Sequence, residues 1–291
     1  MSPFFGFAQF DFAGTLPLAD GRYLAQREEG DGESVLVLQT LAAPPRASRR
    51  RRKPRDAEAA PTPPEVPVAR ATAIRAFDPF DGPEEAAAWL AGATAAEAMI
   101  DAVVATGIAL VNDALHAQAV SAADPYPAAV APERAVAVRL GYGSGEQIAE
   151  GTYSEAREVD VRAIGGSLHR RRQEDMRPQE RVAGILRGRD RTDVCETLLL
   201  RARADLDAGR RHEAALQLRV GVEALLVELP EALDDADHGR DVEALKERRA
   251  TIVAAAERAL RSDLAPEAET SVRESLELAE RILRRRRLLT E

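Results

Sequence analysis

The pattern of apolar residues changes near the middle of the chain, and this change limits the possible folds more than any other feature. Up to Val159, β-prone runs stand between helical patterns. Beyond it, apolar residues recur every three or four positions, as on one face of a helix, and the strand patterns stop. One such stripe consists of Ala215, Leu218, Val222, Leu225 and Leu229. The second half is therefore predicted to bury its core between helices.

The first half is predicted to form a small, mostly antiparallel sheet with helices on one side. Strand patterns cover residues 4–12, 21–41, 66–74 and 135–140. Helical patterns cover residues 81–92 and 95–122. Together these elements predict an α+β domain over residues 1–164.

The second half is predicted to be an all-α bundle over residues 177–291, reached through a polar connector at 165–176. The expected helices span 178–187, 192–208, 212–229, 241–261 and 266–288, with Thr192 and Asp241 as N-caps. Aromatic residues make up 4% of the chain, and most of the apolar residues are Ala, Leu and Val, which favours closely packed helices. We expect a mainly helical protein.

Residues 195–230 have the pattern of a helical hairpin. An Ala/Leu-rich helix precedes the bend "DAGRRHEAA", and Pro230 closes a second helix. With Gly209 at the bend and Glu213 and Ala214 after it, the segment resembles a single tetratricopeptide-type hairpin. No second copy follows at the repeat period, and repeat arrays need about three copies to build a continuous core. The resemblance implies a TPR-like hairpin at 195–230 and fits a protein that contacts other proteins.

A basic segment interrupts the predicted sheet. Residues 42–65 are rich in proline and charge, and we expect a flexible insertion between neighbouring strands. Its positive residues are Arg46, Arg49, Arg50, Arg51, Arg52, Lys53 and Arg55. These seven charges contrast with a net charge of -9, so the rest of the chain carries -16. The segment either folds back on the acidic body or grips phosphate of RNA or DNA, or another acidic partner.

The stretch "AVAVRLGYGSGEQIAEG" from Ala135 places a strand before a glycine-rich segment and a helix. The candidate loop consists of Gly141, Tyr142, Gly143, Ser144, Gly145 and Glu146. It resembles the first motif of class I methyltransferases, which implies a nucleotide or S-adenosylmethionine ligand. The alternatives are a loop that contacts a partner and a structural turn, in which the glycines let the strand bend sharply into a helix. Ser144 and Gln147 form a capping-box pattern, and Thr152 and Glu155 repeat it.

Composition indicates a cytoplasmic protein. Cys195 is the single cysteine, so an intrachain disulfide is excluded and a reducing compartment is favoured. The N-terminus lacks a basic segment before its apolar residues, unlike a signal peptide. The most apolar long window, residues 95–120, contains Glu97, Asp101 and Asp113, so no membrane span is expected. Nearly all positive residues are Arg, which points to a bacterium with GC-rich codons.

Three functions fit these patterns. The first is a non-catalytic cytoplasmic interaction or adaptor protein with an unknown protein partner. The second is an accessory factor that grips nucleic-acid phosphate through residues 46–55. The third is an enzyme that uses a nucleotide or S-adenosylmethionine at residues 141–145. We predict no catalytic residues, cofactor or metal site, since the four histidines share no metal-ligand spacing and Cys195 has no histidine nearby in sequence.

Overall fold

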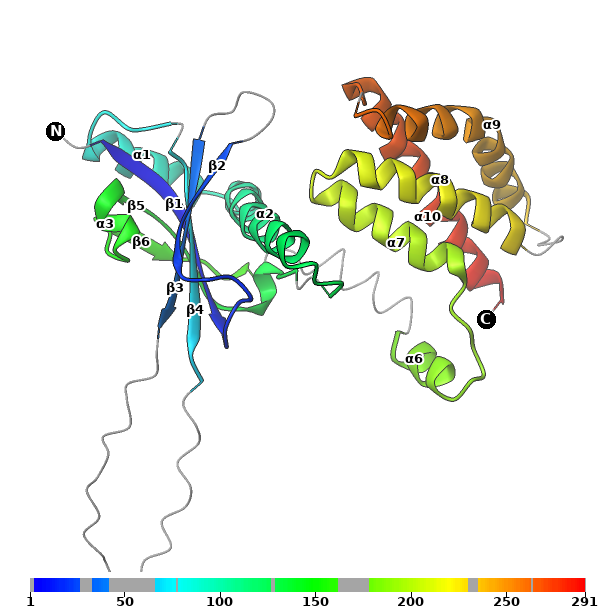
Figure 1. Cartoon of the computed structure of the whole chain (residues 1–291), viewed down its shortest axis with the longest axis horizontal. Helices are drawn as coiled ribbons and strands as arrows, with labels where there is room; N and C mark the ends of the chain where they lie inside the picture. The colour runs from blue at the N-terminus through cyan, green and yellow to red at the C-terminus, as the bar shows by residue number, and fades with distance from the viewer. Residues whose placement is uncertain are drawn as a thin grey trace, which may run out of the picture. The chain divides into compact units, whose positions relative to one another are not determined.

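The computed structural model divides the chain into two compact units, Met1–Gln173 and Glu174–Glu291 (Figure 1). It describes residues 3–26, 33–41, 66–76, 78–126, 129–161, 178–229, 235–262 and 264–290. The predicted insertion at 42–65 and the predicted connector at 165–176 lie outside these residues. The exact domain limits therefore stay predictions.

The first unit contains an antiparallel sheet, as the sequence predicts, and this sheet has six strands. Its strands are β1 Phe4–Ala13, β2 Gly21–Gln26, β3 Glu33–Leu41, β4 Val68–Ile74, β5 Ala135–Ser144 and β6 Glu155–Glu158. They lie in the order β2-β3-β4-β1-β5-β6, so β1 is central and β2 and β6 form the edges. The sequence missed β6, because it predicts a capping box at Thr152 and Glu155 where the chain instead pairs with β5.

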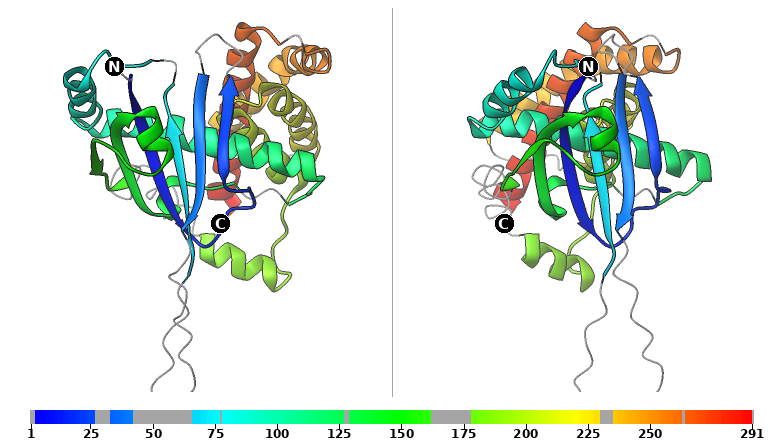
Figure 2. Two further views of the ribbon diagram at one scale, coloured as in Figure 1. Left: turned by 60° about the vertical axis from the view of Figure 1, so that its left-hand side comes forward. Right: turned by 90° about the vertical axis from the view of Figure 1, so that its left-hand side faces the viewer.

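Helices cover the two faces of this sheet unequally (Figure 2). The face carrying Phe10 and Leu140, called here the helical face, packs against α1 Pro83–Ala93 and α2 Glu97–Ala122. The short helix α3, Gly145–Ala149, lies on the opposite face, called here the α3 face. The prediction that helices lie on one side is thus confirmed for the two long ones. A 3-10 turn, Pro132–Arg134, leads into β5.

Strand β1 suits the centre of the sheet because its side chains are buried on both faces. Ala8, Phe10 and Phe12 enter the core of the helical face, whereas Phe7 enters the smaller core under α3. Gly6 is required for close packing, since a Cβ there would lie 2.7 Å from the Trp89 ring of α1. The continuous apolar run of the strand follows from burial on both sides.

The second unit is a bundle of helices, as predicted. Its described helices are α6 Pro178–Leu186, α7 Val194–Asp207, α8 Arg211–Glu228, α9 Ala236–Ala259 and α10 Pro266–Thr290. Two predicted caps are wrong. Asp193 caps α7 in place of Thr192, with Glu196 completing a capping box. Asp235 caps α9, so the helix begins at Ala236, five residues before its expected start, while Asp241 lies inside that helix and pairs with Arg281.

Helices α7 and α8 form the predicted hairpin around the bend at Gly209, whose φ of +74° is in the left-handed region that favours glycine. The two helices approach closely at Gly221, where a Cβ would lie 2.9 Å from Leu199 Cδ2. Leu199 and Leu218 are fully buried at this contact. Small residues at the crossing therefore set the spacing of the hairpin.

Candidate binding groove

Helix α2 carries apolar residues on two adjacent sides. One side packs into the sheet through Val104, Ile108, Val111 and Leu115. The second side, shifted around the helix, consists of Met99, Val103, Thr106, Leu110, Ala114 and Ala117. Met99 is 50% exposed. An ordinary surface helix buries one apolar stripe, whereas α2 has a second one, of which Val103, Leu110 and Ala114 are only partly buried against the core.

This second stripe forms one wall of a groove of about 1030 Å³, named here the α2 groove. The floor is the helical face of the sheet between β1 and β3, including Ala8, Leu36 and Ala73. Tyr23 of β2 lines the far wall, and Trp89 of α1 closes one end. The groove belongs entirely to the first unit, and its lining is mainly apolar.

Small residues create the space. Helix α2 comes closest to the sheet at Gly107, where a Cβ would lie 2.9 Å from Ala8 Cβ and 3.0 Å from Phe10 Cε2. Beside this contact the floor carries only methyl groups at Ala8 and Ala73, whereas Phe10 and Phe12 fill the space under the core stripe of α2. The sheet therefore contacts one side of α2 and leaves an open space beside the other side.

Charged groups line the groove at separate places. At the end formed by α1, the Arg75 guanidinium lies over the Trp89 ring, with Cζ 6.0 Å from the ring centroid. Arg75 also pairs with Asp78 at 3.3 Å, and both side chains are substantially exposed. Asp113, together with Gln118 and Ser121, lines the part nearer the C-terminal end of α2. Between them, the Thr106 hydroxyl donates to the Ala102 carbonyl of its own helix at 2.9 Å.

By length and composition α2 could cross a membrane, which is weak evidence for a span. The mean hydropathy of its most apolar 18-residue window is 1.6, and 22% of that window is buried. Its core stripe nevertheless packs on the sheet of the first unit. The apolar character of this helix is evident in the sequence, and the second stripe is visible in the spacing of its residues, but the groove is not predicted from them.

The glycine-rich segment from Gly141 has a structural role in the sheet. Strand β5 continues through Gly141 and Gly143 to Ser144, so the expected sharp turn at these glycines is wrong and the bend comes after Ser144. A Cβ at Gly141 would lie 2.5 Å from the Glu155 carbonyl oxygen, and one at Gly143 would lie 3.2 Å from Ile148 Cγ1. The returning chain therefore lies close against both glycines.

The contacts of the other residues in the candidate loop also fit a structural role. Tyr142 is buried in the helical-face core. Ser144 and Gln147 form the predicted capping box, and Glu146 is exposed and pairs with Arg22 at 3.4 Å. Within the described part of the chain, the strand that follows Gly145 is antiparallel, unlike the parallel strands of methyltransferase folds.

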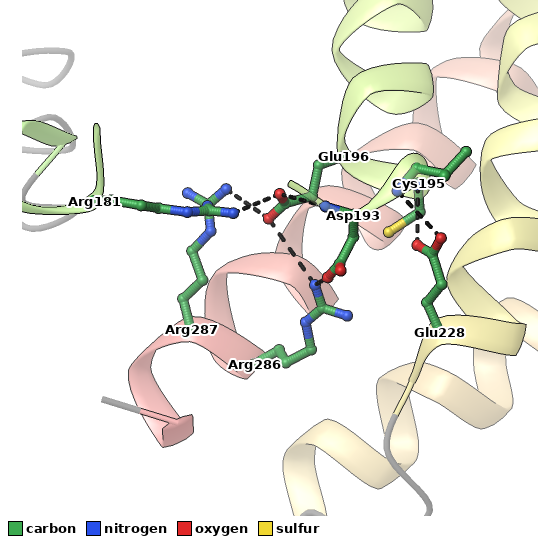
Figure 3. Close-up of polar contacts among 8 residues, drawn as sticks. Arg181, Asp193, Cys195, Glu196, Glu228, Arg286 and Arg287 are labelled. Carbon is green, nitrogen blue, oxygen red and sulfur yellow. Dashed lines mark hydrogen bonds and ion pairs between the residues drawn. The ribbon is translucent and has the colours of Figure 1, made fainter. Parts of the chain in front are cut away.

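The predicted basic residues between 46 and 55 lie outside the described residues, and the structure gives them no position. A second basic group, on the last helix, is described. Arg286 and Arg287 of this group pair with carboxylates near the start of α7 (Figure 3).

The carboxylate of Glu196 is the centre of this cluster. Its side chain is 4% exposed and accepts hydrogen bonds from Arg181 at 2.5 Å and Arg287 at 2.8 Å (Figure 3). Burial raises the pKa of the Glu196 carboxyl, but the two guanidinium groups outweigh it, so its pKa lies below the ordinary value. Asp193 pairs with Arg286 in the same cluster. The cluster joins α6, α7 and α10.

Asp193, Cys195 and Glu228 lie close enough to suggest a metal site, with their ligand atoms within 4.8 Å of one another. Their other contacts favour a structural role. The Glu228 carboxylate accepts hydrogen bonds from the backbone N–H groups of Val194 and Cys195 at 3.1 and 3.0 Å (Figure 3). Burial, followed by the neighbouring Glu228, raises the pKa of the Cys195 thiol to about 12, so the thiol stays protonated near neutral pH.

Comparisons of this chain with models of protein families, with curated proteins and with solved structures found no match. The function proposed below therefore depends on the geometry of the chain itself.

Proposed function

We propose that this protein is a non-catalytic interaction protein whose contact site is the α2 groove. One observation carries the proposal: a helix with membrane-like hydropathy, only 22% buried over its most apolar window, lies beside a groove of about 1030 Å³. Apolar surface in contact with water is unfavourable, and large apolar patches on proteins commonly mark binding sites. The groove is therefore the surface that a partner or ligand stabilises by covering it.

The helical unit is suited to a second contact. The α7–α8 hairpin exposes apolar side chains, with Leu200 70% and Val227 83% exposed. Two contact surfaces on two units fit the adaptor role that the sequence favours, in the cytoplasm as its single cysteine suggests. We assign the groove the main contact, because scattered exposed apolar side chains are common on soluble proteins.

An apolar fluorescent dye tests this function. The dye is expected to bind the full chain, and an extract of the source cells is expected to displace it. Thr106→Arg places a charge on the exposed groove wall and should abolish dye binding. Val120→Arg is the matched control, because Val120 is 68% exposed on the same helix but does not line the groove. Equal dye binding by both variants, or no displacement by any extract fraction, would contradict the proposal.

The basic segment supports a second function, the grip on nucleic-acid phosphate. Its seven positive charges have no acidic residue among them from Arg46 to Arg55. Phosphate contacts of this kind weaken steeply with salt. Deletion of residues 46–55 should then remove RNA and DNA binding measured across a salt series. Undetectable binding by the intact chain at low salt would exclude this function.

The third function, an enzyme that uses the Gly141–Gly145 segment, has less support. The returning chain lies against Gly141 and Gly143, so their backbone is not open to a ligand. Helix α3 is also too short, at five residues, to offer a developed N-terminal dipole.

A further inference from the structure

We propose that the α2 groove binds a single long, unbranched acyl chain, with a terminal carboxylate beside Arg75 and the tail directed along α2 toward Ala117. This inference rests on the proposed function, because it names the occupant of the same groove. Three observations carry it: the length and volume of the groove, the character of its middle part, and the charge at one end.

The dimensions fit one chain-like ligand. Along α2 the lining runs from Met99 to Ser121, which corresponds to about 33 Å at the rise of an α-helix. A hexadecanoyl chain can lie extended over this length. The volume of about 1030 Å³ is at the upper end of sites that hold one small molecule.

The middle of the groove offers apolar contact without hydrogen-bonding side chains directed to a ligand. Val103 and Leu110 lie on its α2 wall, and Leu36 lies on its floor. Thr106, the hydroxyl in this part of α2, is bonded to its own helix. An extended peptide would leave its backbone N–H and C=O groups unpaired there, which costs free energy, whereas an acyl chain has no such groups.

Arg75 supplies the charge for the head group. Its guanidinium lies over the Trp89 ring at the end of the groove, with Cζ 6.0 Å from the ring centroid. Its observed pair with Asp78 is exposed, at 33% and 60% of the two side chains, and exposed ion pairs contribute little stability. A ligand carboxylate anchored by its buried tail can therefore replace Asp78. The acidic side chain in the groove, Asp113, lies farther along α2, so the carboxylate is expected at the Arg75 end.

The test is displacement of the apolar dye from the full chain by hexadecanoate, hexadecanol and octanoate, each below its micellar concentration. Hexadecanoate should displace the dye with a stoichiometry of one and bind more tightly than octanoate. Arg75→Ala should weaken hexadecanoate about tenfold and leave hexadecanol unchanged, because only the carboxylate uses the guanidinium. Ala102→Trp, which fills the groove without adding charge, should weaken both long ligands, and Val120→Arg should weaken neither.

Several results would overturn the inference. One is failure of hexadecanoate to displace the dye, and another is equal weakening of hexadecanoate and hexadecanol in Arg75→Ala. Binding to phosphatidylcholine vesicles without binding to monomeric hexadecanoate would identify a membrane surface as the occupant. Displacement by the protein fraction of a cell extract and not by hexadecanoate would identify a protein partner. In these last two cases the inference fails while the proposed function stands. If the groove binds none of these ligands, both the inference and the proposed function are excluded.

Discussion

Asp11 on β1 and Arg70 on β4 lie opposite each other in the register of the two strands and form a two-point ion pair, with Arg70 Nε 2.7 Å from Asp11 Oδ1 and Nη2 2.9 Å from Oδ2. From the other side, Arg139 on β5 donates to Asp11 Oδ2 at 2.7 Å. The Asp11 side chain is 10% exposed. One carboxylate thus ties three neighbouring strands together on the α3 face.

Replacing Asp11 should destabilise the first unit. Asp11→Asn removes the buried carboxylate that Arg70 and Arg139 share and leaves Arg139 only its exposed partner Glu158, and we expect a loss of about 3 kcal/mol in the free energy of unfolding. Urea denaturation followed by tryptophan fluorescence measures this, because Trp89 lies in the same unit. Glu158→Gln is the control, since Glu158 pairs with Arg139 through a 65% exposed side chain and should matter little. Equal losses of unfolding free energy in both variants would contradict the stabilising role of Asp11.

The stability of the protein should fall in acid. Burial raises the pKa of Asp11, but hydrogen bonds from Arg70 and Arg139 outweigh it and hold the pKa below the ordinary value, and the pKa of Glu196 is likewise lowered. For a lowered pKa, the unfolded chain binds more protons, so the contribution is present above the ordinary carboxyl pKa of about 4 and is lost as the pH falls through the folded-state value. The free-energy difference between wild type and Asp11→Asn should shrink below that pH. A difference that stays constant down to the acid transition would contradict this.

Replacing Glu196 should loosen the bundle. Glu196→Gln removes the charge that Arg181 and Arg287 share in a nearly buried site, and the expected loss is about 3 kcal/mol. Thermal unfolding followed by far-UV circular dichroism measures it. Glu243→Gln provides the comparison, because Glu243 pairs with Lys246 on the exposed surface of α9. A variant with an unchanged melting temperature would show that the cluster contributes nothing.

Cys195 should resist alkylation in the folded protein. Its side chain is fully buried, and burial together with Glu228 raises the pKa of its thiol to about 12, so little reactive thiolate forms. Iodoacetamide labelling followed by mass spectrometry should show modification in denaturant and protection without it. Rapid labelling under native conditions would instead indicate an accessible thiol and a different packing at the start of α7.

Gly141 should tolerate no larger residue. The added methyl group of Gly141→Ala would lie 2.5 Å from a backbone carbonyl oxygen of β6 and 2.6 Å from the Phe7 ring, so β6 would have to move. We expect a destabilisation of about 2 kcal/mol, as for other overpacked sites. Gly92→Ala is the control, because its Cβ meets open space and alanine favours helix. Chemical denaturation of the two variants compares them, and a neutral Gly141→Ala would contradict the packing described.

The sequence determines the class of each half, because periodicity reports which side of an element is buried. The 3.6-residue stripe from Ala215 to Leu229 predicts α8, and the alternation from Val66 to Ile74 predicts β4. Local chemistry also suffices for the capping box at Ser144. These features depend on residues that are near one another in the chain.

Tertiary structure decides what depends on distant residues. Thr152 and Glu155 carry the same capping pattern as Ser144 and Gln147, yet Glu155 begins a strand, because pairing with β5 outweighs the local preference. The α2 groove likewise depends on distant residues. Gly107 of α2 packs closely against Ala8 of β1, and the small side chains on the floor of the sheet leave space beside this contact. The apolar spacing of α2 shows that two stripes must be covered; the packing of the sheet decides which stripe is buried and which is left to line the groove.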